Sequence, residues 1–434
     1  MIFSLTQLEG ITLTLNRQMM KFFQFIVFAV LLNACNRETS SDPNNSSSPN
    51  LLWKVSTVDD GHIAESGIIR ASVSAKGNIL VGGRFKNERA LFFLNGNTGE
   101  KIWTWNDYLY KNGNRDIYFP SVFNNTFYCQ LANSNYAIDI ISGKTIWSNK
   151  FNNTFGNYVN LVGEKFFTGI GSDKSLNSNL LGFYKNSIND GVPNLIDVPQ
   201  YDTTNMLQTS GQTGEVDFVL PYYSGTDTLL VVCYSDPPIT NFKFRNAIGL
   251  YNFSKMNWVY KRIVLDESSS FGFDDNPKIL ESKVYCIVAG KLSCNTVLTG
   301  ESSWIKTFDP VSSFLSTGFI IADNKIFANN ENLYLYCLDP KTGATIWKQG
   351  IFGTCSQMTY LNGVVYFVCG GDGKLYAIDA ANGNKLWAIS SPDVKISSQA
   401  SFDRYVGLIP PQNGQKGKIV VTTGLNAYCY EAYK

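Results

Sequence analysis

Histidine is almost absent from this sequence, and charge and vicinal cysteines are scarce. The chain of 434 residues has one histidine, His62, and no two of its nine cysteines are adjacent. The sequence therefore offers almost no histidine from which a serine–histidine–aspartate triad or a multi-histidine zinc site could be built. Charged residues make up 16%, and 36 Lys and Arg against 35 Asp and Glu leave a net charge of +1. With no long basic run, the composition argues against a nucleic-acid partner.

Helical periodicity is lacking as well, so the few polar clusters have no helix N-terminus beside them. Asp59, Asp60 and His62 are close enough in sequence to hold a metal, but we prefer to interpret them as a polar loop just after the closing strand. The Gly-rich residues 370–373 lie between two alternating segments, which indicates a hairpin turn and not a phosphate loop. We read Asp274 and the aspartate after it as a turn too. No metal site is expected.

The beginning of the chain carries an export signal. Lys21 precedes the apolar residues 22–32, which are too few to span a bilayer, and Cys35 follows at once. This arrangement resembles a bacterial lipoprotein signal, in which the cysteine becomes lipidated after cleavage. An ordinary secretory peptide cut near Ala34 is the alternative. Residues 1–19 fit neither, so we expect the true start at residue 20 and a signal peptide over 20–34.

A polar tether follows the predicted lipid attachment at Cys35. Residues 36–50 contain no apolar side chain and are rich in Ser, Asn and Pro, so they cannot bury a core. We expect residues 35–50 to be a flexible leash and residues 51–434 to be one folded domain. The eight remaining cysteines lie in apolar runs and read as small buried side chains. If a disulfide exists among them, Cys286 with Cys294 across a hairpin is our candidate.

Four copies of one ten-residue pattern are clear. In each, Asp or Asn precedes Gly by four residues and Gly precedes Trp by four: LNGNTGEKIW (94–103), IDIISGKTIW (138–147), LDPKTGATIW (338–347) and IDAANGNKLW (378–387). The Asp can accept backbone N–H groups of a tight turn, and the Gly can take the left-handed conformation that reverses the chain. The turn residues are therefore Asp139, Gly143, Asp339, Gly343, Asp379 and Gly383.

Alternating strands flank these turns, and four short strands in each period of about forty residues make one propeller blade. The Trp-to-Trp intervals leave one long gap, between Trp147 and Trp258, which holds a Trp-less unit at 155–199. The last unit lacks its final strand, and residues 51–55 supply a strand with Trp53. The sequence thus predicts an all-β, eight-bladed propeller of four-stranded antiparallel blades, closed by the N-terminal strand, which leaves no exposed end.

The repeat resembles the PQQ-like repeats of the quinoprotein dehydrogenase type, most closely at 372–387. The resemblance implies that the repeat tryptophans dock each blade on its neighbour: Trp53, Trp103, Trp147, Trp258, Trp304, Trp347 and Trp387. Family enzymes that use PQQ carry a disulfide between adjacent cysteines and a calcium held by Glu, Asn and Asp. Because this sequence has no adjacent cysteines, we expect no cofactor and no catalytic residue.

One connection is long and mixes aromatic with basic residues. Within residues 236–246 lie Phe242, Lys243, Phe244 and Arg245, residue types that are enriched at binding hot spots. We predict a partner contact there, and the alternative is a loop that packs down on its own blade.

Signal, tether and repeats together resemble the outer-membrane assembly lipoproteins, tethered propellers that support β-barrel insertion. We therefore expect a monomeric, lipid-anchored, non-catalytic scaffold in the cell envelope of a Gram-negative bacterium, on its outer membrane, held to the membrane through Cys35. Its partner would be an envelope protein or glycan. The alternatives are a PQQ-dependent dehydrogenase and a surface lipoprotein that binds glycans or peptides.

Overall fold

Thirty-two short strands and their turns account for nearly all of the described chain. The computed structural model describes residues 48–59, 73–86, 88–107, 117–131, 134–150, 160–162, 166–172, 181–203, 214–237, 239, 243–268, 272–308, 318–330, 332–353, 355–396, 400–403 and 405–434. The chain divides into residues 1–46 and 47–434, and every described residue belongs to the second unit. The predicted signal peptide, Cys35, His62 and Phe242 lie outside the described residues.

The first four sheets follow one another along the chain, and each has its strands in sequence order. Blade 1 contains β2 (Val73–Ala75), β3 (Asn78–Phe85), β4 (Glu88–Leu94) and β5 (Lys101–Trp105). Blade 2 contains β6 (Ile117–Phe123), β7 (Thr126–Leu131), β8 (Ser134–Asp139) and β9 (Thr145–Lys150). Blade 3 contains β10 (Asn160–Val162), β11 (Phe166–Ser172), β12 (Leu181–Ser187) and β13 (Pro193–Asp197). Blade 4 contains β14 (Glu215–Ser224), β15 (Asp227–Ser235), β16 (Phe244–Asn252) and β17 (Asn257–Ser268).

The next three sheets repeat this order, and the eighth differs. Blade 5 contains β18 (Lys278–Leu280), β19 (Lys283–Val288), β20 (Lys291–Thr296) and β21 (Ser302–Lys306). Blade 6 contains β22 (Phe319–Ala322), β23 (Lys325–Asn330), β24 (Tyr334–Leu338) and β25 (Thr345–Gly350). Blade 7 contains β26 (Thr359–Leu361), β27 (Val364–Val368), β28 (Leu375–Asp379) and β29 (Lys385–Ile389). Blade 8 contains β30 (Val406–Ile409), β31 (Lys418–Thr422), β32 (Asn426–Glu431) and, from the other end of the domain, β1 (Leu51–Ser56).

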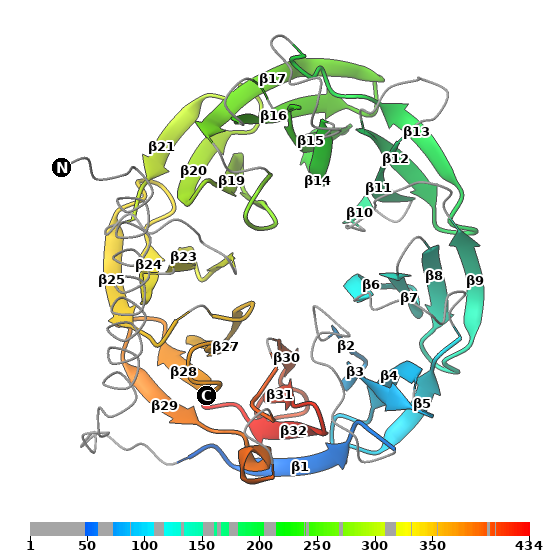
Figure 1. Cartoon of the computed structure of the whole chain (residues 1–434), viewed down its shortest axis with the longest axis vertical. Helices are drawn as coiled ribbons and strands as arrows, with labels where there is room; N and C mark the ends of the chain where they lie inside the picture. The colour runs from blue at the N-terminus through cyan, green and yellow to red at the C-terminus, as the bar shows by residue number, and fades with distance from the viewer. Residues whose placement is uncertain are drawn as a thin grey trace, which may run out of the picture. The chain divides into compact units, whose positions relative to one another are not determined.

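The predicted closure is confirmed. β1 pairs antiparallel with β32, with Trp53 opposite Cys429 and Ser56 opposite Asn426. Figure 1 shows the eight sheets arranged as a ring in which β1 and β32 lie side by side. The expected Trp-less unit is blade 3, whose strands run from residue 160 to residue 197. Since the outermost strand of blade 8 is β1, the ring has no unpaired end blade.

Each blade is buried on both faces because it is packed between two neighbours. All five residues of β27 are buried, so this strand reads as a continuous apolar run and not as an alternating one. One core cluster joins Phe327 and Cys337 of blade 6 to Phe367 and Ile378 of blade 7. The apolar core is therefore distributed between the blades around the ring.

Two details differ from what the sequence indicated. A short 3-10 helix, η3 (Pro392–Lys395), begins after Ser391, whose hydroxyl accepts the backbone N–H of Asp393. The proposed pairing of Cys286 with Cys294 is wrong: Cys286 lies opposite Ser293, and Cys294 lies opposite Tyr285. A register offset of one residue puts the two thiols on opposite faces of blade 5, where they join different core clusters.

Candidate functional site

Five repeat tryptophans make the same contact with the following blade. Each indole N–H donates to the carbonyl three residues before the turn glycine of that blade: Trp53 to Gly96 (3.2 Å), Trp103 to Ile140 (2.9 Å), Trp147 to Ile188 (3.0 Å), Trp304 to Pro340 (3.0 Å) and Trp347 to Ala380 (3.2 Å). The indole rings cover the turn glycines, which are Gly99, Gly143, Gly191, Gly343 and Gly383. In blades 1, 2 and 6 the repeat thus supplies both the indole ring that docks on the following blade and the turn glycine that the preceding blade's ring covers.

The turn residues act as their spacing suggests. Asp139 accepts the backbone N–H of Ser142 at 2.6 Å, and Asp379 accepts that of Ala381 at 2.8 Å. Asp339 accepts the N–H groups of Lys341 at 2.7 Å and Thr342 at 3.0 Å. Gly143, Gly343 and Gly383 have φ of 69°, 70° and 78°, a conformation in which a side chain would be strained.

Trp258 lies in a different position from the other tryptophans. It faces blade 3, where its indole N–H donates to the Asp197 carboxylate at 2.9 Å. Tyr260 occupies the docking position instead, and its hydroxyl donates to the Val297 carbonyl at 2.9 Å. Val297 stands three residues before Gly300, so the tyrosine reaches the carbonyl that a tryptophan reaches in the five blades described above. Trp387 is 5% exposed and packs among residues of blades 7 and 8.

Two described residues of the predicted partner loop, Phe244 and Arg245, are held by contacts within the protein. Phe244 is 6% exposed, which agrees with the alternative in which the loop packs down. The Arg245 guanidinium pairs with Asp202 at 2.5 Å and with Glu267 at 3.1 Å. The ammonium of Lys243 lies 3.8 Å from Glu267, and both side chains are exposed. A partner contact through Lys243 stays a prediction.

Arg262 of β17 belongs to the same network. The Arg262 guanidinium forms a close ion pair with the buried carboxylate of Asp236 and lies 3.8 Å from Asp202. We call these charged residues the blade-4 ion cluster: Asp202, Asp236, Arg245, Arg262 and Glu267. Burial raises the pKa of Asp236, although the backbone N–H of Asp202 and the two arginines oppose the shift. The cluster fixes the end of blade 4 and leaves Lys243 and Glu267 most accessible.

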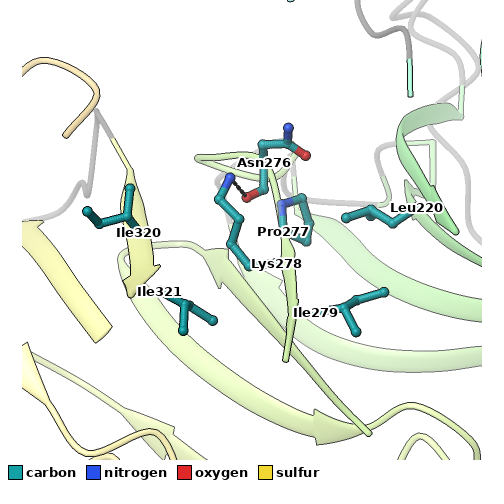
Figure 2. Close-up of a pocket in the computed structure, with 7 residues that line it drawn as sticks. All are labelled: Leu220, Asn276, Pro277, Lys278, Ile279, Ile320 and Ile321. Atoms are coloured by element: carbon teal, nitrogen blue, oxygen red, sulfur yellow. Dashed lines mark hydrogen bonds between the residues drawn. The ribbon is translucent and has the colours of Figure 1, made fainter. Parts of the chain in front are cut away.

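A pocket of about 400 Å³ lies among the first strands of blades 4, 5 and 6. We call it the axial pocket; its lining residues are Leu220, Asn276, Pro277, Lys278, Ile279, Ile320 and Ile321. Figure 2 shows the aliphatic side chains around the pocket and the Lys278 ammonium next to Asn276. In Figure 1 β14, the strand that contributes Leu220 to the pocket, lies near the centre of the ring, as do β6 and β10.

Lys278 brings the one positive charge to this lining. Its ammonium donates to the Asn276 carbonyl at 2.8 Å and lies 5.6 Å from the centre of the Phe319 ring. Burial lowers the pKa of Lys278, and the Asp275 carboxylate opposes that shift. Burial raises the pKa of Asp275, which accepts the backbone N–H of Phe319 at 3.1 Å and so connects blades 5 and 6. Aliphatic walls with one ammonium suit an apolar group that carries an anionic end.

The described residues contain neither a cluster of metal-ligating side chains nor a membrane-spanning helix. In that part of the chain no three Asp, Glu, His or Cys side chains gather as a metal site would require. Asp59 accepts the backbone N–H of Lys86 at 2.7 Å, and Asp274 accepts that of Gly290 at 2.9 Å. Within the same described part, no helix has the length and apolar character to cross a membrane.

A closed ring of eight four-stranded blades, several of them joined by indole–glycine contacts, is a β-propeller. A family model described as outer membrane protein assembly factor BamB matches residues 289–421, from blade 5 into blade 8. Together with the fold, this match confirms the resemblance to PQQ-like repeat propellers. None of the curated proteins matches the chain significantly.

Solved structures of three kinds share the fold at low identity. BamB from Moraxella catarrhalis is 9% identical with a TM-score of 0.54, over 89% of this chain and 100% of that one. Sqt1 from Saccharomyces cerevisiae is 12% identical with a TM-score of 0.60, over 89% of this chain and 100% of that one. Quinohemoprotein alcohol dehydrogenase from Comamonas testosteroni is 10% identical with a TM-score of 0.62, over 88% of this chain and 76% of that one. The similarity therefore shows the fold and leaves the activity open.

Proposed function

We propose that the protein is a lipid-anchored, non-catalytic scaffold of the Gram-negative cell envelope that binds another envelope protein, as a BamB-like lipoprotein would. The observation that carries the proposal is the surface of blade 4. Its strands have 10, 9, 9 and 12 residues, longer than those of any other blade. Four exposed apolar side chains lie on it, with exposed fractions of 46% to 59%: Tyr223, Met256, Val259 and Val264. Exposed apolar side chains of this size, Tyr and Met among them, favour a partner surface.

Site-specific photo-crosslinking tests the partner surface. A photoreactive residue at Val264 or Met256 should give one discrete adduct with an envelope protein in intact cells. Ile346 on β25 is the matched control, because it is 49% exposed on the outer strand of a regular blade. The same adducts from Ile346, or no adduct from blade 4, would contradict the proposal.

Lipid anchoring is tested separately at Cys35. The ring begins at Leu51, so residues 36–50 would leave a leash of about 15 residues between lipid and propeller, long enough to keep the ring clear of the membrane surface. The Cys35→Ala variant should move from the membrane fraction to the soluble envelope fraction. Unchanged membrane association would exclude the anchor, while leaving the blade-4 test unaffected.

The axial pocket favours a second candidate, a lipoprotein that binds a peptide by an apolar side chain and a carboxylate. Titration of the protein with N-acetylleucine should shift the amide signals or intrinsic fluorescence, and its uncharged methyl ester should bind more weakly. Lys278→Met should remove that difference between acid and ester. Equal binding of both ligands by the unmodified protein would contradict a role for the ammonium.

A PQQ-dependent dehydrogenase is the remaining alternative from the resemblance. PQQ titrated with calcium would show a spectral change on binding to such an enzyme, and we expect none here. We expect no spectral change because the sequence lacks the adjacent cysteines that family enzymes carry.

A further inference from the structure

Eight cysteines lie in the described chain, and all are buried free thiols in this structure. Most of them serve as small apolar core residues. Cys355 and Cys369 are different, because they face each other as the two partners of an antiparallel bridge within blade 7. Cys355 lies in the connection from β25 to β26, and Cys369 begins the turn from β27 to β28.

The backbone hydrogen bonds fix the type of this bridge. The N–H of Ser356 donates to the Val368 carbonyl at 2.7 Å, so the bond joins the residue after Cys355 to the residue before Cys369. That pattern marks a non-hydrogen-bonded pair, whose Cα atoms are about 4.5 Å apart and whose side chains are closest. Disulfides span Cα separations of about 4.4 to 6.8 Å, so the separation typical of such a pair lies at the lower end of the range that a disulfide can bridge.

We propose that Cys355 and Cys369 form a disulfide in the mature protein. The existence of the bond in cells rests on the proposed envelope location, where thiols are oxidised. Two thiols lose two protons and two electrons as the sulfur–sulfur bond forms. The acceptor is the disulfide of a thiol oxidoreductase or of oxidised glutathione, which is reduced to two thiols.

The bond would form during folding. Burial raises the pKa of both Cys355 and Cys369, so neither is a reactive thiolate once blade 7 is packed. Oxidation therefore requires that the connection around Cys355 be still open. Afterwards the bond would hold this connection, whose Cys355 N–H donates to Asn329 of blade 6 at 2.9 Å, against the β27–β28 turn. The disulfide would thus secure the seam between blades 6 and 7.

The test is to refold the full chain in a mixture of reduced and oxidised glutathione and to map its thiols by mass spectrometry after alkylation. Trypsin cuts after Lys348 and Lys374 and leaves both cysteines on peptide 349–374. We expect this peptide unalkylated and lighter by two hydrogens than its reduced form. Further cleavage after Tyr360 should give two fragments that separate only on reduction. Recovery of both cysteines alkylated, or of either one linked elsewhere, would overturn the proposal.

A thermal measurement adds a second readout with a matched control. Reduction should lower the Tm of the oxidised protein by about 5 °C, as expected for a loop of this length. Cys337→Ala, in the same core cluster, should keep that difference, whereas Cys355→Ala should lose it. A Tm unaffected by reduction would count against the bond. If the bond forms on refolding but is absent from protein isolated from cells, the result would contradict the proposed envelope location and would still support the pairing of Cys355 with Cys369.

Discussion

Trp347 and Gly383 are in contact across the seam between blades 6 and 7. Replacing either residue alone should therefore lower the stability of the protein. A Cβ added to Gly383 would lie 2.7 Å from indole atom Cε3, closer than van der Waals contact allows. The same relationship joins Trp53 to Gly99 at the closure of the ring. The repeat spacing therefore encodes contacts between neighbouring blades as well as the turns within each.

Gly383→Ala should destabilise the protein by about 3 kcal/mol, through left-handed strain and the clash with Trp347. Gly414→Ala is the matched control, because its φ is 77° against 78° for Gly383 and an added Cβ would meet nothing within 4 Å. The control should lose only about 1 kcal/mol. Chemical denaturation of the two variants measures the difference. Equal losses of stability in the two variants would mean that the Trp347 indole moves aside at no energetic cost.

The ring was predictable because its signals are local. Asp339, Gly343 and Trp347 set a turn and a docking ring within ten residues, and the repetition of that unit fixed the number of blades. The sequence did not predict on which face of the sheet Cys286 and Cys294 lie, because a shift of one residue in the hairpin register moves a side chain to the other face. The turn before Trp258 has no glycine to set the register, so the sequence did not distinguish Trp258 from Tyr260 as the docking residue.

The axial pocket and the Cys355–Cys369 bridge could not be foreseen for a different reason. Lys278 meets Ile320 only after blades 5 and 6 pack together, and nothing in the spacing of the repeat specifies those inner side chains. Cys355 precedes its blade's first strand, outside the repeated motif. Sites built from connections and inner strands depend on tertiary packing, whereas the motif records only turns and outer strands.

Tyr260→Phe should cost about 1 kcal/mol, because the Val297 carbonyl loses its donor while the ring packing remains. Trp258→Phe should cost a similar amount through the separate bond to Asp197. Adding Asp197→Ala should leave the effect of Tyr260→Phe unchanged and should reduce the effect of Trp258→Phe. Thermal unfolding of the single and double variants tests this assignment. Coupling between Tyr260 and Asp197 would contradict it.

Asp393 of η3 should make the closure of the ring sensitive to acid. Burial alone would raise its pKa, but hydrogen bonds from Asn426, Thr423 and Tyr428 and the Lys54 ammonium lower it overall. A carboxyl with a lowered pKa in the folded state stabilises the protein above its unfolded pKa of about 3.9. That stabilisation is lost as the pH falls through the folded-state value.

Asp393→Asn should therefore lower stability at pH 7 by about 2 kcal/mol, and its effect should become smaller once the pH falls through the lowered folded-state pKa of Asp393, where the carboxyl is protonated. Melting curves from pH 2 to pH 7 measure this difference. Asp323→Asn is the control, because Asp323 is an exposed partner of Lys325 and should change stability little at any pH. A constant difference between the unmodified protein and Asp393→Asn across the range would exclude the assignment.

Arg262 supports the buried carboxylate of Asp236, so its loss should be more damaging than that of an exposed cation. Arg262→Met leaves a buried charge with less compensation and should cost about 3 to 5 kcal/mol at pH 7. Adding Asp236→Asn should restore part of that stability, because the charge that needed the guanidinium is gone. Lys255→Met is the matched control, since Lys255 pairs with Asp227 at 2.7 Å on the exposed side of the same blade. Denaturant unfolding of the four proteins decides the matter: if Arg262→Met behaves like Lys255→Met, water reaches Asp236 and the blade-4 ion cluster does not hold the end of the blade.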